Sequence, residues 1–451
     1  MLTYSSKLLT ILSLSRHGSR APNPVVQTLC PGNAKNLDSY HVPFEQLTEI
    51  GMVQMQQLGI FMRQRYIEGM SFLSPSLSDS HLVQGERPEH FEVYFQADPA
   101  ARCAQSAMTM ASGLYPYGTG PSSFPMQPIS IVQQVAAQDV TFCVPKTKCF
   151  ATCKADVDTY DKGYGTTLLD SHATLMADVG RLCGVFPAEY ATIPHGEDEV
   201  LGIKDVADAF IFDEAQGLPP LPGLNDSTRS IFRQLQFTML MERYYSTPRQ
   251  ITYWSSDFPN VLLRNFKIAT AENLNAIPAI RYYSYHGHRE LLYAVSLLLG
   301  IPLHFPNQPS AFNQTAVPPA ATLLFELHSN DVDSTAVLKS SNTTYYVKTF
   351  TWSYDTGLQS VQLKNCSSVE CPLDDFANII HSHFAKTGTW QDICSSSANT
   401  PIVPLIINHQ LSLQQIVWKC VWTCGVLSIV IIAAAVYVHV IRSRDQYRRI
   451  V

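Results

Sequence analysis

The chain has 451 residues, of which 46% are hydrophobic and 15% charged, and its formal net charge is -6. This composition excludes a disordered chain, which lacks the apolar residues for a core, and a fibrous repeat, because Gly is only 22. Nucleic-acid binding is disfavoured because such proteins are usually basic, and the length allows one large domain with an insertion or two to three smaller ones.

The first part of the chain predicts alternating strands and helices. An apolar run at 8–15 predicts a buried strand, and apolar residues at helical spacing predict a helix over 44–66. A second strand is expected at 91–95 and a helix at 102–114. Such alternation is typical of an α/β fold with a parallel sheet.

The middle of the chain, residues 125–265, differs from this pattern. It has helical-looking stretches at 168–182 and 230–245, separated by the Pro-rich break at 217–222. These features predict a mainly helical insertion.

Strand and helix character then returns. The sequence predicts strands at 279–285, 321–327 and 345–352 and helices at 290–299 and 374–384. We therefore expect an α/β core formed by residues 1–124 and 266–410, with residues 125–265 as an insertion into it.

Residues 420–441 contain no Asp, Glu, Lys or Arg, which predicts one transmembrane helix, because about 20 apolar residues span a bilayer. The tail, 442–451, holds four Arg and favours the cytosolic side. We expect a single-pass type I membrane protein with a lumenal or extracellular body. A clean signal peptide is not evident, so the start is truncated or residues 7–15 act as an uncleaved signal. A tail-anchored protein with a cytosolic body is the alternative.

Cysteines and glycosylation signals agree with a lumenal body. Nine Cys precede the apolar run, a high count for a reduced cytosolic domain. The Asn-x-Ser/Thr sequons, at which glycans are expected, begin at Asn225, Asn313, Asn342 and Asn365.

The strongest local signal is the sequence RHGSRAP at residues 16–22, directly after the first predicted strand. Ligands of α/β sheets bind beyond the carboxyl ends of strands. The guanidiniums of Arg16 and Arg20 match phosphate oxygens, and the imidazole of His17 between them can attack phosphorus. This pattern indicates phosphoryl chemistry.

These residues resemble the histidine acid phosphatases, in branch 2 of the histidine phosphatase superfamily, whose signature is Arg-His-Gly-x-Arg-x-Pro after the first strand. The segment from Leu47 to Tyr66 resembles the first helix of that family, and Arg102 with Ser106 resembles the arginine after its second strand. Residues 366–373, CSSVECPL, resemble the prostatic and lysosomal members in particular.

The resemblance implies a mainly parallel sheet flanked by helices, with a helical cap. It implies that His17 is the nucleophile that forms a phosphohistidine. Arg16, Arg20 and Arg102 would then hold the phosphoryl oxygens and stabilise the transition state. No metal or other cofactor is implied, because the guanidiniums supply the positive charge. It also implies a disulfide between Cys366 and Cys371.

The position of the second catalytic histidine of the family is ambiguous in the sequence YSYHGHRE at 283–290. Choosing His288 places Leu292, Val295 and Leu299 at core-facing helical positions. Choosing His286 would instead place Glu290 and Tyr293 at the first two of these positions, and burying an unpaired carboxylate is costly. We therefore predict His288 as the second histidine.

The family has an aspartate after this histidine, which protonates the leaving group, but here Arg289 follows His288. Glu290 is the nearest carboxyl group and is predicted to be the general acid, as in the His-Ala-Glu variant of the inositol polyphosphate phosphatases. Asp98 is the next candidate. The alternative for Glu290 is a carboxylate that only favours the helix dipole.

We expect an acid phosphatase that hydrolyses phosphate monoesters in a lysosomal, endosomal or cell-surface membrane. An inositol polyphosphate phosphatase and a weakly active protein that binds phosphorylated ligands are the alternatives. The stretch from Tyr447 to Ile450 fits Tyr-x-x-apolar and resembles sorting signals that an adaptor reads, or it is simply a basic stop-transfer tail. A homodimer is also compatible with the resemblance.

Overall fold

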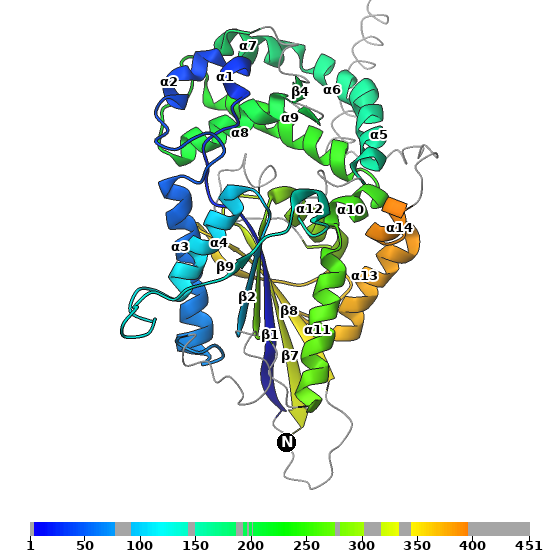
Figure 1. The fold of residues 1–451 in the computed structure, drawn as a ribbon. Helices are drawn as coiled ribbons and strands as arrows, with labels where there is room; N and C mark the ends of the chain where they lie inside the picture. Colours follow the sequence, from blue (N-terminus) through cyan, green and yellow to red (C-terminus); the bar gives the residue numbers. More distant parts are fainter. Residues whose placement is uncertain are drawn as a thin grey trace, which may run out of the picture. The chain divides into compact units, whose positions relative to one another are not determined.

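The computed structural model describes residues 4–76, 92–142, 149–185, 193–195, 198–200, 202–275, 280–301, 317–332 and 344–395. Its centre is an eight-stranded sheet with the order β10-β8-β7-β1-β6-β2-β3, in which β9 also pairs with β8 (Figure 1). The strands are β1 (Tyr4–Arg16), β2 (Val93–Ala97), β3 (Ile131–Val132), β6 (Tyr282–Gly287), β7 (Thr322–Val332), β8 (Thr344–Ser353), β9 (Gly357–Val361) and β10 (Glu370–Pro372).

The sheet is mixed rather than mainly parallel, which corrects the expectation. Strands β1, β6, β2 and β3 run parallel, whereas β7, β8, β9 and β10 each pair with their neighbours in antiparallel fashion. Parallel neighbours need a crossover of about a dozen residues or more, usually a helix. The short connections at 333–343 and 354–356 leave no room for one, so the last strands fold back as antiparallel neighbours.

Helices cover both faces of the sheet because β1 is apolar on both faces (Figure 1). On one face, Ile11 packs in a buried cluster with Met55 of α3 and Met110 of α4. On the other, Leu12 packs in a cluster with Phe266 of α11 and with residues of α12 and α13. The covering helices are α3 (Glu49–Arg63), α4 (Ala101–Leu114), α10 (Pro248–Ser255), α11 (Phe258–Asn275), α12 (Arg289–Leu299), α13 (Leu373–Thr387) and α14 (Trp390–Ser395).

A second group of helices lies beyond one end of the sheet (Figure 1). It contains α1 (Val26–Leu29), α2 (Ala34–Leu37), α5 (Phe150–Tyr160), α6 (Thr166–Ser171), α7 (Ala173–Cys183), α8 (Gly202–Ala215), α9 (Asp226–Tyr245) and the ribbon β4 (Ile193–His195) with β5 (Asp198–Val200). Its own buried cluster joins Val26 and Leu37 to Val179, Val206 and Leu235. The segment with α1 and α2, which sequence reasoning assigned to the core, therefore packs with these cap helices.

Short 3-10 and π segments extend or link these elements: η1 (Pro31–Asn33), η2 (Gln64–Gly69), η3 (Ala136–Gln138) and η5 (Asp161–Gly165).

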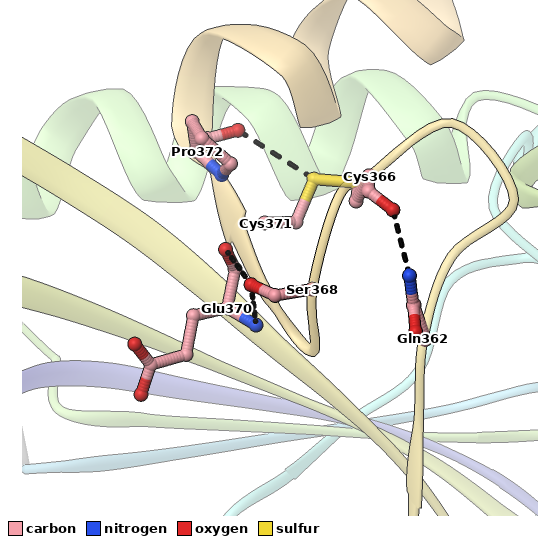
Figure 2. The surroundings of a disulfide bond; sticks show 6 residues. All are labelled: Gln362, Cys366, Ser368, Glu370, Cys371 and Pro372. Carbon is pink, nitrogen blue, oxygen red and sulfur yellow. Dashed lines mark hydrogen bonds between the residues drawn. A yellow bond between two sulfur atoms is a disulfide. The ribbon is translucent and has the colours of Figure 1, made fainter.

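The described residues contain three disulfides. Cys30–Cys183 and Cys149–Cys394 join segments that are distant in sequence, and Cys366–Cys371 closes a short loop. The last of them is the bridge that the family resemblance implied, and Figure 2 shows it at the base of a short loop. Just before that loop, Gln362 Nε2 donates to the carbonyl oxygen of Cys366 at 3.0 Å. Among the cysteines that the structure describes, Cys103 and Cys153 remain free, buried thiols.

The expected membrane span at 420–441 and the basic tail at 442–451 lie outside the described residues. Within the part of the chain that is described, every helix is too short or too polar to cross a bilayer.

Candidate active site

Three parallel strands end at the same edge of the sheet and place their following residues together. Arg16 at the end of β1 pairs in register with Gly287 at the end of β6, and Ala97 at the end of β2 pairs with His286. The residues after these strand ends, including His17 and His288, therefore meet at one site. This is where ligands bind in α/β sheets.

One ring nitrogen of His17 makes a hydrogen bond, and the other is available as the nucleophile's lone pair. Its Nδ1 lies 2.8 Å from the carbonyl oxygen of Gly18, which can only accept a hydrogen bond, so Nδ1 carries the proton. The lone pair of the neutral ring is then on Nε2. Burial, with the positive charges of Arg102, Arg16, His288 and Arg20, lowers the pKa of His17 well below its ordinary value. The imidazole therefore stays neutral, and nucleophilic, in acidic solution.

The loop that carries His17 is clamped against two helices. A Cβ on Gly18 would lie 2.3 Å from the carbonyl oxygen of Gly51 in α3, so only glycine fits this approach. The backbone N–H of Gly18 donates to Ser106 Oγ of α4 at 3.1 Å, and that of Ser19 donates to Gln54 Oε1 of α3 at 2.9 Å. Residues far apart in sequence thus fix the loop, including the Ser106 that the family resemblance singled out.

The predicted arginines, Arg16, Arg20 and Arg102, lie around His17. Each guanidinium supplies a positive charge and N–H donors there. Arg16 and Arg20 are buried, and burial is the main reason that the pKa of each falls to about 10. The Nε atoms of Arg16, Arg20 and Arg102 are all buried without a hydrogen-bond partner among the described residues. Because buried polar groups are almost always paired, these donors fit an anion with several oxygens, such as phosphate.

His288 faces His17, and His286 does not. The ring centroids of His17 and His288 lie 5.4 Å apart with an interplanar angle of 75°. His286 is fully buried, stacks on Phe95, and hydrogen bonds to Ser284 Oγ at 2.8 Å. Burial lowers the pKa of His286 to about 3, so this ring is a neutral part of the core. The geometry favours His288 as the second histidine.

The sequence argument for His288, which rested on the core-facing positions of the following helix, was incomplete. In α12, Leu292, Val295 and Leu299 are buried, as the choice of His288 requires. Tyr293 is buried as well, although it was expected at a core position only in the other register. Its hydroxyl accepts a hydrogen bond from the backbone N–H of Val317 at 2.9 Å, which satisfies its polar atom.

Glu290 lies in an environment that disfavours its expected role as a proton donor. Its Oε1 is 3.3 Å from Arg289 Nε. Burial alone would raise the pKa of Glu290, but the charges of Arg289, Lys204 and His288 outweigh it and lower the pKa to about 2. The carboxylate is then ionised even at acidic pH.

Asp98 contacts the second histidine directly. Its Oδ1 lies 3.2 Å from His288 Nε2 and accepts a hydrogen bond from the backbone N–H of Ala100 at 2.8 Å. Its Oδ2 is buried without a hydrogen-bond partner among the described residues. Burial opposes ionisation of Asp98, but the contact with His288 dominates and lowers its pKa. The pKa of His288 is correspondingly raised to about 10 by Cys103 and Asp98, despite the opposing effect of burial.

Sequence reasoning missed Asp208, which neutralises Arg289. The guanidinium donates to both carboxylate oxygens at 2.7 and 2.8 Å, and both side chains are buried. Asp208 belongs to α8 of the cap, whereas Arg289 begins α12 of the core. The sequence signal is that Asp205, Asp208 and Asp213 lie in a largely apolar helix, in which all three are buried.

The remaining predicted residues lie away from this cluster. Asn225 is exposed and caps α9, where its side chain accepts a hydrogen bond from Thr228 N at 2.8 Å. Asn365 is exposed next to the bridged Cys366. Asn313, Asn342 and the stretch from Tyr447 to Ile450 lie outside the described residues.

Comparisons with known proteins match most of the chain. A family model described as "Histidine phosphatase superfamily (branch 2)" matches residues 7–351. The chain is 22% identical over 383 residues to human prostatic acid phosphatase, covering 83% of this chain and 85% of that protein. It is also 22% identical over 408 residues to Xenopus laevis lysosomal acid phosphatase, covering 88% and 81%. A match to putative acid phosphatase 1 of Caenorhabditis elegans, 28% identical over 144 residues, spans 32% of this chain and only 27% of that protein.

Solved structures show the same fold at low identity. A phytase from Hafnia alvei matches with a TM-score of 0.57 and 18% identity, covering 84% of this chain and 97% of that one. A multiple inositol polyphosphate phosphatase from Bifidobacterium longum matches with a TM-score of 0.54 and 12% identity, covering 86% and 96%.

Proposed function

The chain belongs to branch 2 of the histidine phosphatase superfamily, and from this premise we propose that it is an acid phosphatase that hydrolyses phosphate monoesters through a phosphohistidine on His17. The observation that carries the proposal is a neutral His17, whose Nε2 lone pair is free, beside three buried arginine Nε–H groups without an acceptor among the described residues. A phosphate group supplies both the target for the nucleophile and the acceptors for the donors.

The reaction divides into two displacements. In the first, His17 Nε2 bonds to phosphorus while the bond from phosphorus to the ester oxygen breaks, and the leaving oxygen takes up a proton. The imidazole becomes cationic, and the hydrogen bond from Nδ1 to the Gly18 carbonyl stabilises that charge. In the second, water attacks phosphorus and His17 leaves, which releases phosphate. Arg16, Arg20 and Arg102 stabilise the charge on the equatorial oxygens in both steps.

We assign the proton for the leaving group to Asp98 rather than to the expected Glu290. Asp98 touches His288 at the site and keeps one buried oxygen without a partner among the described residues. Both carboxylates are ion-paired, but the partner of Glu290 is a guanidinium that keeps its proton, whereas the partner of Asp98 is an imidazole that can give one up. A phosphate dianion bound beside Asp98 raises its pKa, because a like charge disfavours the ionised form.

Trapping the intermediate tests this function directly. The full-length protein, mixed with a ³²P-labelled phosphate monoester and quenched in alkaline denaturant, which preserves the phosphorus–nitrogen bond, should carry label on His17. His17→Ala should carry none and lose about 10⁴-fold or more of kcat, as expected for removal of a nucleophile. Full activity of His17→Ala, or label on another residue, would end the proposal.

A second candidate is an inositol polyphosphate phosphatase. It is favoured by Glu290, two residues after His288 as in the His-Ala-Glu variant, and by fold relatives described as a phytase and an inositol polyphosphate phosphatase. Comparing kcat/KM on myo-inositol hexakisphosphate and on simple monoesters separates the two. Phosphate binding without turnover on either would support the weakly active alternative.

We further propose that the body lies on a lumenal or extracellular side. Three disulfides support an oxidising compartment, and the curated relatives include a lysosomal and a prostatic acid phosphatase. Anchoring by residues 420–441, glycosylation at the sequons and sorting through Tyr447 to Ile450 remain parts of this proposal that rest on the sequence.

A further inference from the structure

Three side chains with metal-binding atoms meet beside the catalytic histidines. Asp98 follows β2, Cys103 lies in α4, and His288 follows β6. One ligand atom from each lies within 4.8 Å of the others. His288 Nε2 is 3.2 Å from Asp98 Oδ1 and 3.8 Å from Cys103 Sγ.

These separations suit a tetrahedral ion. Zinc binds imidazole nitrogen and carboxylate oxygen at about 2.0–2.2 Å and thiolate sulfur at about 2.3 Å, so neighbouring ligand atoms lie roughly 3.3–3.6 Å apart. The observed distances need only small side-chain rotations to reach those values. Three protein ligands with an open fourth position form the arrangement of zinc sites that keep a water or another small ligand.

Two observations beyond the spacing point to a ligand. Asp98 is 2% exposed, and its Oδ2 has no hydrogen-bond partner among the described residues. Cys103 is fully buried, forms no disulfide, and has no part in the phosphatase chemistry above. An unpaired buried oxygen costs free energy, and a bound cation removes that cost.

We propose that Asp98, Cys103 and His288 form a zinc-binding site, and that zinc bound there blocks the phosphatase. Binding releases the thiol proton of Cys103 and the Nε2 proton of His288, because the thiolate and the neutral imidazole are the ligands. The ion binds the carboxylate of Asp98, which can then no longer protonate the leaving group. Metal occupancy and turnover therefore exclude each other. The blocking step rests on the proposed function, whereas metal binding does not.

The ligand set selects a soft divalent cation. A thiolate and an imidazole favour zinc over magnesium or calcium, which prefer oxygen ligands. The carboxylate and the thiolate together cancel the charge of the ion. This cancellation matters because Arg16, Arg20 and Arg102 make the surroundings positive, and an uncompensated cation would be repelled there.

Cobalt(II) substitution tests the binding without any assay of activity. Co²⁺ added to the full-length protein should give the intense near-ultraviolet absorption of a thiolate–cobalt bond and the visible bands of a tetrahedral ion, and Zn²⁺ should abolish both. Cys103→Ser should remove the thiolate absorption and weaken Zn²⁺ binding by at least about 100-fold, since even partners of metal ligands contribute about 10–100-fold. Asp98→Asn should weaken binding while it keeps the thiolate band at high Co²⁺.

The matched control is Cys153→Ser, which changes the other described free thiol, in α5, and should leave the spectrum unchanged. Thermal unfolding shows that each variant is folded. Absence of the thiolate band in the wild-type protein, or its persistence in folded Cys103→Ser, would overturn the metal site.

Inhibition is measured separately, on β-glycerophosphate, whose leaving group needs a proton. Zn²⁺ should inhibit the wild-type protein reversibly, with full recovery on chelation. Cys103→Ser, compared with its own activity in metal-free buffer, should resist the same Zn²⁺ concentration. Cobalt binding without inhibition by zinc would overturn the blocking step alone. A protein that binds cobalt but has no activity with or without metal would refute the proposed function and leave the site standing.

Discussion

At the scale of single residues, the site combines a neutral imidazole with donors that lack acceptors. Neutrality of His17 follows from burial and from four neighbouring positive groups, and its reactive nitrogen follows from the bond between Nδ1 and the Gly18 carbonyl. The arginine Nε–H groups of Arg16, Arg20 and Arg102 are costly to bury unpaired. A bound phosphate supplies the acceptors that these donors lack and the phosphorus that His17 attacks.

The two histidines at the end of β6 should respond differently to substitution. His288→Ala should lower kcat about 10²–10³-fold, because it removes the imidazole that faces His17 and pairs with Asp98. His286→Ala should lower the melting temperature, because it leaves a cavity in the core beside Phe95, but it should spare kcat per folded molecule. Steady-state kinetics and thermal unfolding on both variants check this. A larger loss of kcat in folded His286→Ala would show that His286, and not His288, is the second catalytic histidine.

Leaving-group dependence should identify the proton donor. Asp98→Asn should slow β-glycerophosphate about 10²–10⁴-fold and p-nitrophenyl phosphate much less, because nitrophenolate leaves without a proton. Glu290→Gln should change both rates little, since Glu290 is ionised in its pair with Arg289. The measurement is kcat/KM for both variants on both substrates in metal-free buffer. The opposite ranking would return the acid role to Glu290.

Residues in contiguous motifs were predictable, and residues that act through long-range contacts were not. His17, Arg16 and Arg20 lie in one short motif, and the chemistry of that motif can be inferred without knowledge of the fold. Asp208 lies 81 positions from Arg289, and nothing local shows that the two meet. The expected acid, Glu290, was chosen by closeness in sequence, whereas Asp98 reaches His288 only because β2 and β6 are neighbours.

At the scale of elements, the order of strand and helix was predictable in outline, but the direction of the last strands was not. Apolar runs predict strands near 8–15, 279–285 and 345–352, and the structure has β1, β6 and β8 there. Apolar composition does not encode whether neighbours run parallel. The predicted strands at 321–327 and 345–352 leave enough residues between them for a crossover, so the sequence did not show that these neighbours pair antiparallel.

The ion pair between α8 and α12 should be a strong link between cap and core. Arg289 and Asp208 have side-chain exposures of only 5% and 6%, so removing one partner leaves an uncompensated buried charge. Asp208→Leu or Arg289→Met alone should lower the free energy of unfolding by about 3–5 kcal/mol. The double variant should recover only part of that loss, because Glu290 also loses Arg289 as its partner. Urea unfolding of the two single variants and the double variant measures the coupling.

A pair on the cap surface provides the control for this cycle. Asp178 and Arg181 lie 3.7 Å apart, and their side chains are 54% and 71% exposed. Asp178→Ala should change the free energy of unfolding by less than about 1 kcal/mol, because solvent screens exposed pairs. Equal effects at the buried and exposed pairs would show that burial of the Arg289–Asp208 pair has no energetic consequence.

At the scale of the whole molecule, disulfides tie together segments that are remote in sequence. Cys30–Cys183 links the segment between α1 and α2 to the end of α7, and Cys149–Cys394 links the start of the cap to α14. The two bridges span 153 and 245 positions, whereas Cys366–Cys371 spans five. The long bridges hold the N-terminal, cap and C-terminal parts of the described fold in one unit.

This difference in span predicts the order in which loss of each bridge destabilises the protein. Closing a loop removes entropy from the unfolded chain as the logarithm of its length, about 5 kcal/mol for each long bridge and about 2 kcal/mol for the short one. Replacing both cysteines of Cys149–Cys394 by alanine should therefore lower the free energy of unfolding by more than the same change at Cys366–Cys371. Urea unfolding under oxidising conditions measures both variants, and reduction of the wild-type protein should match the combined loss of all three bridges. If the short bridge proves the more stabilising one, its effect comes from local packing at the start of α13 rather than from constraint of the unfolded chain.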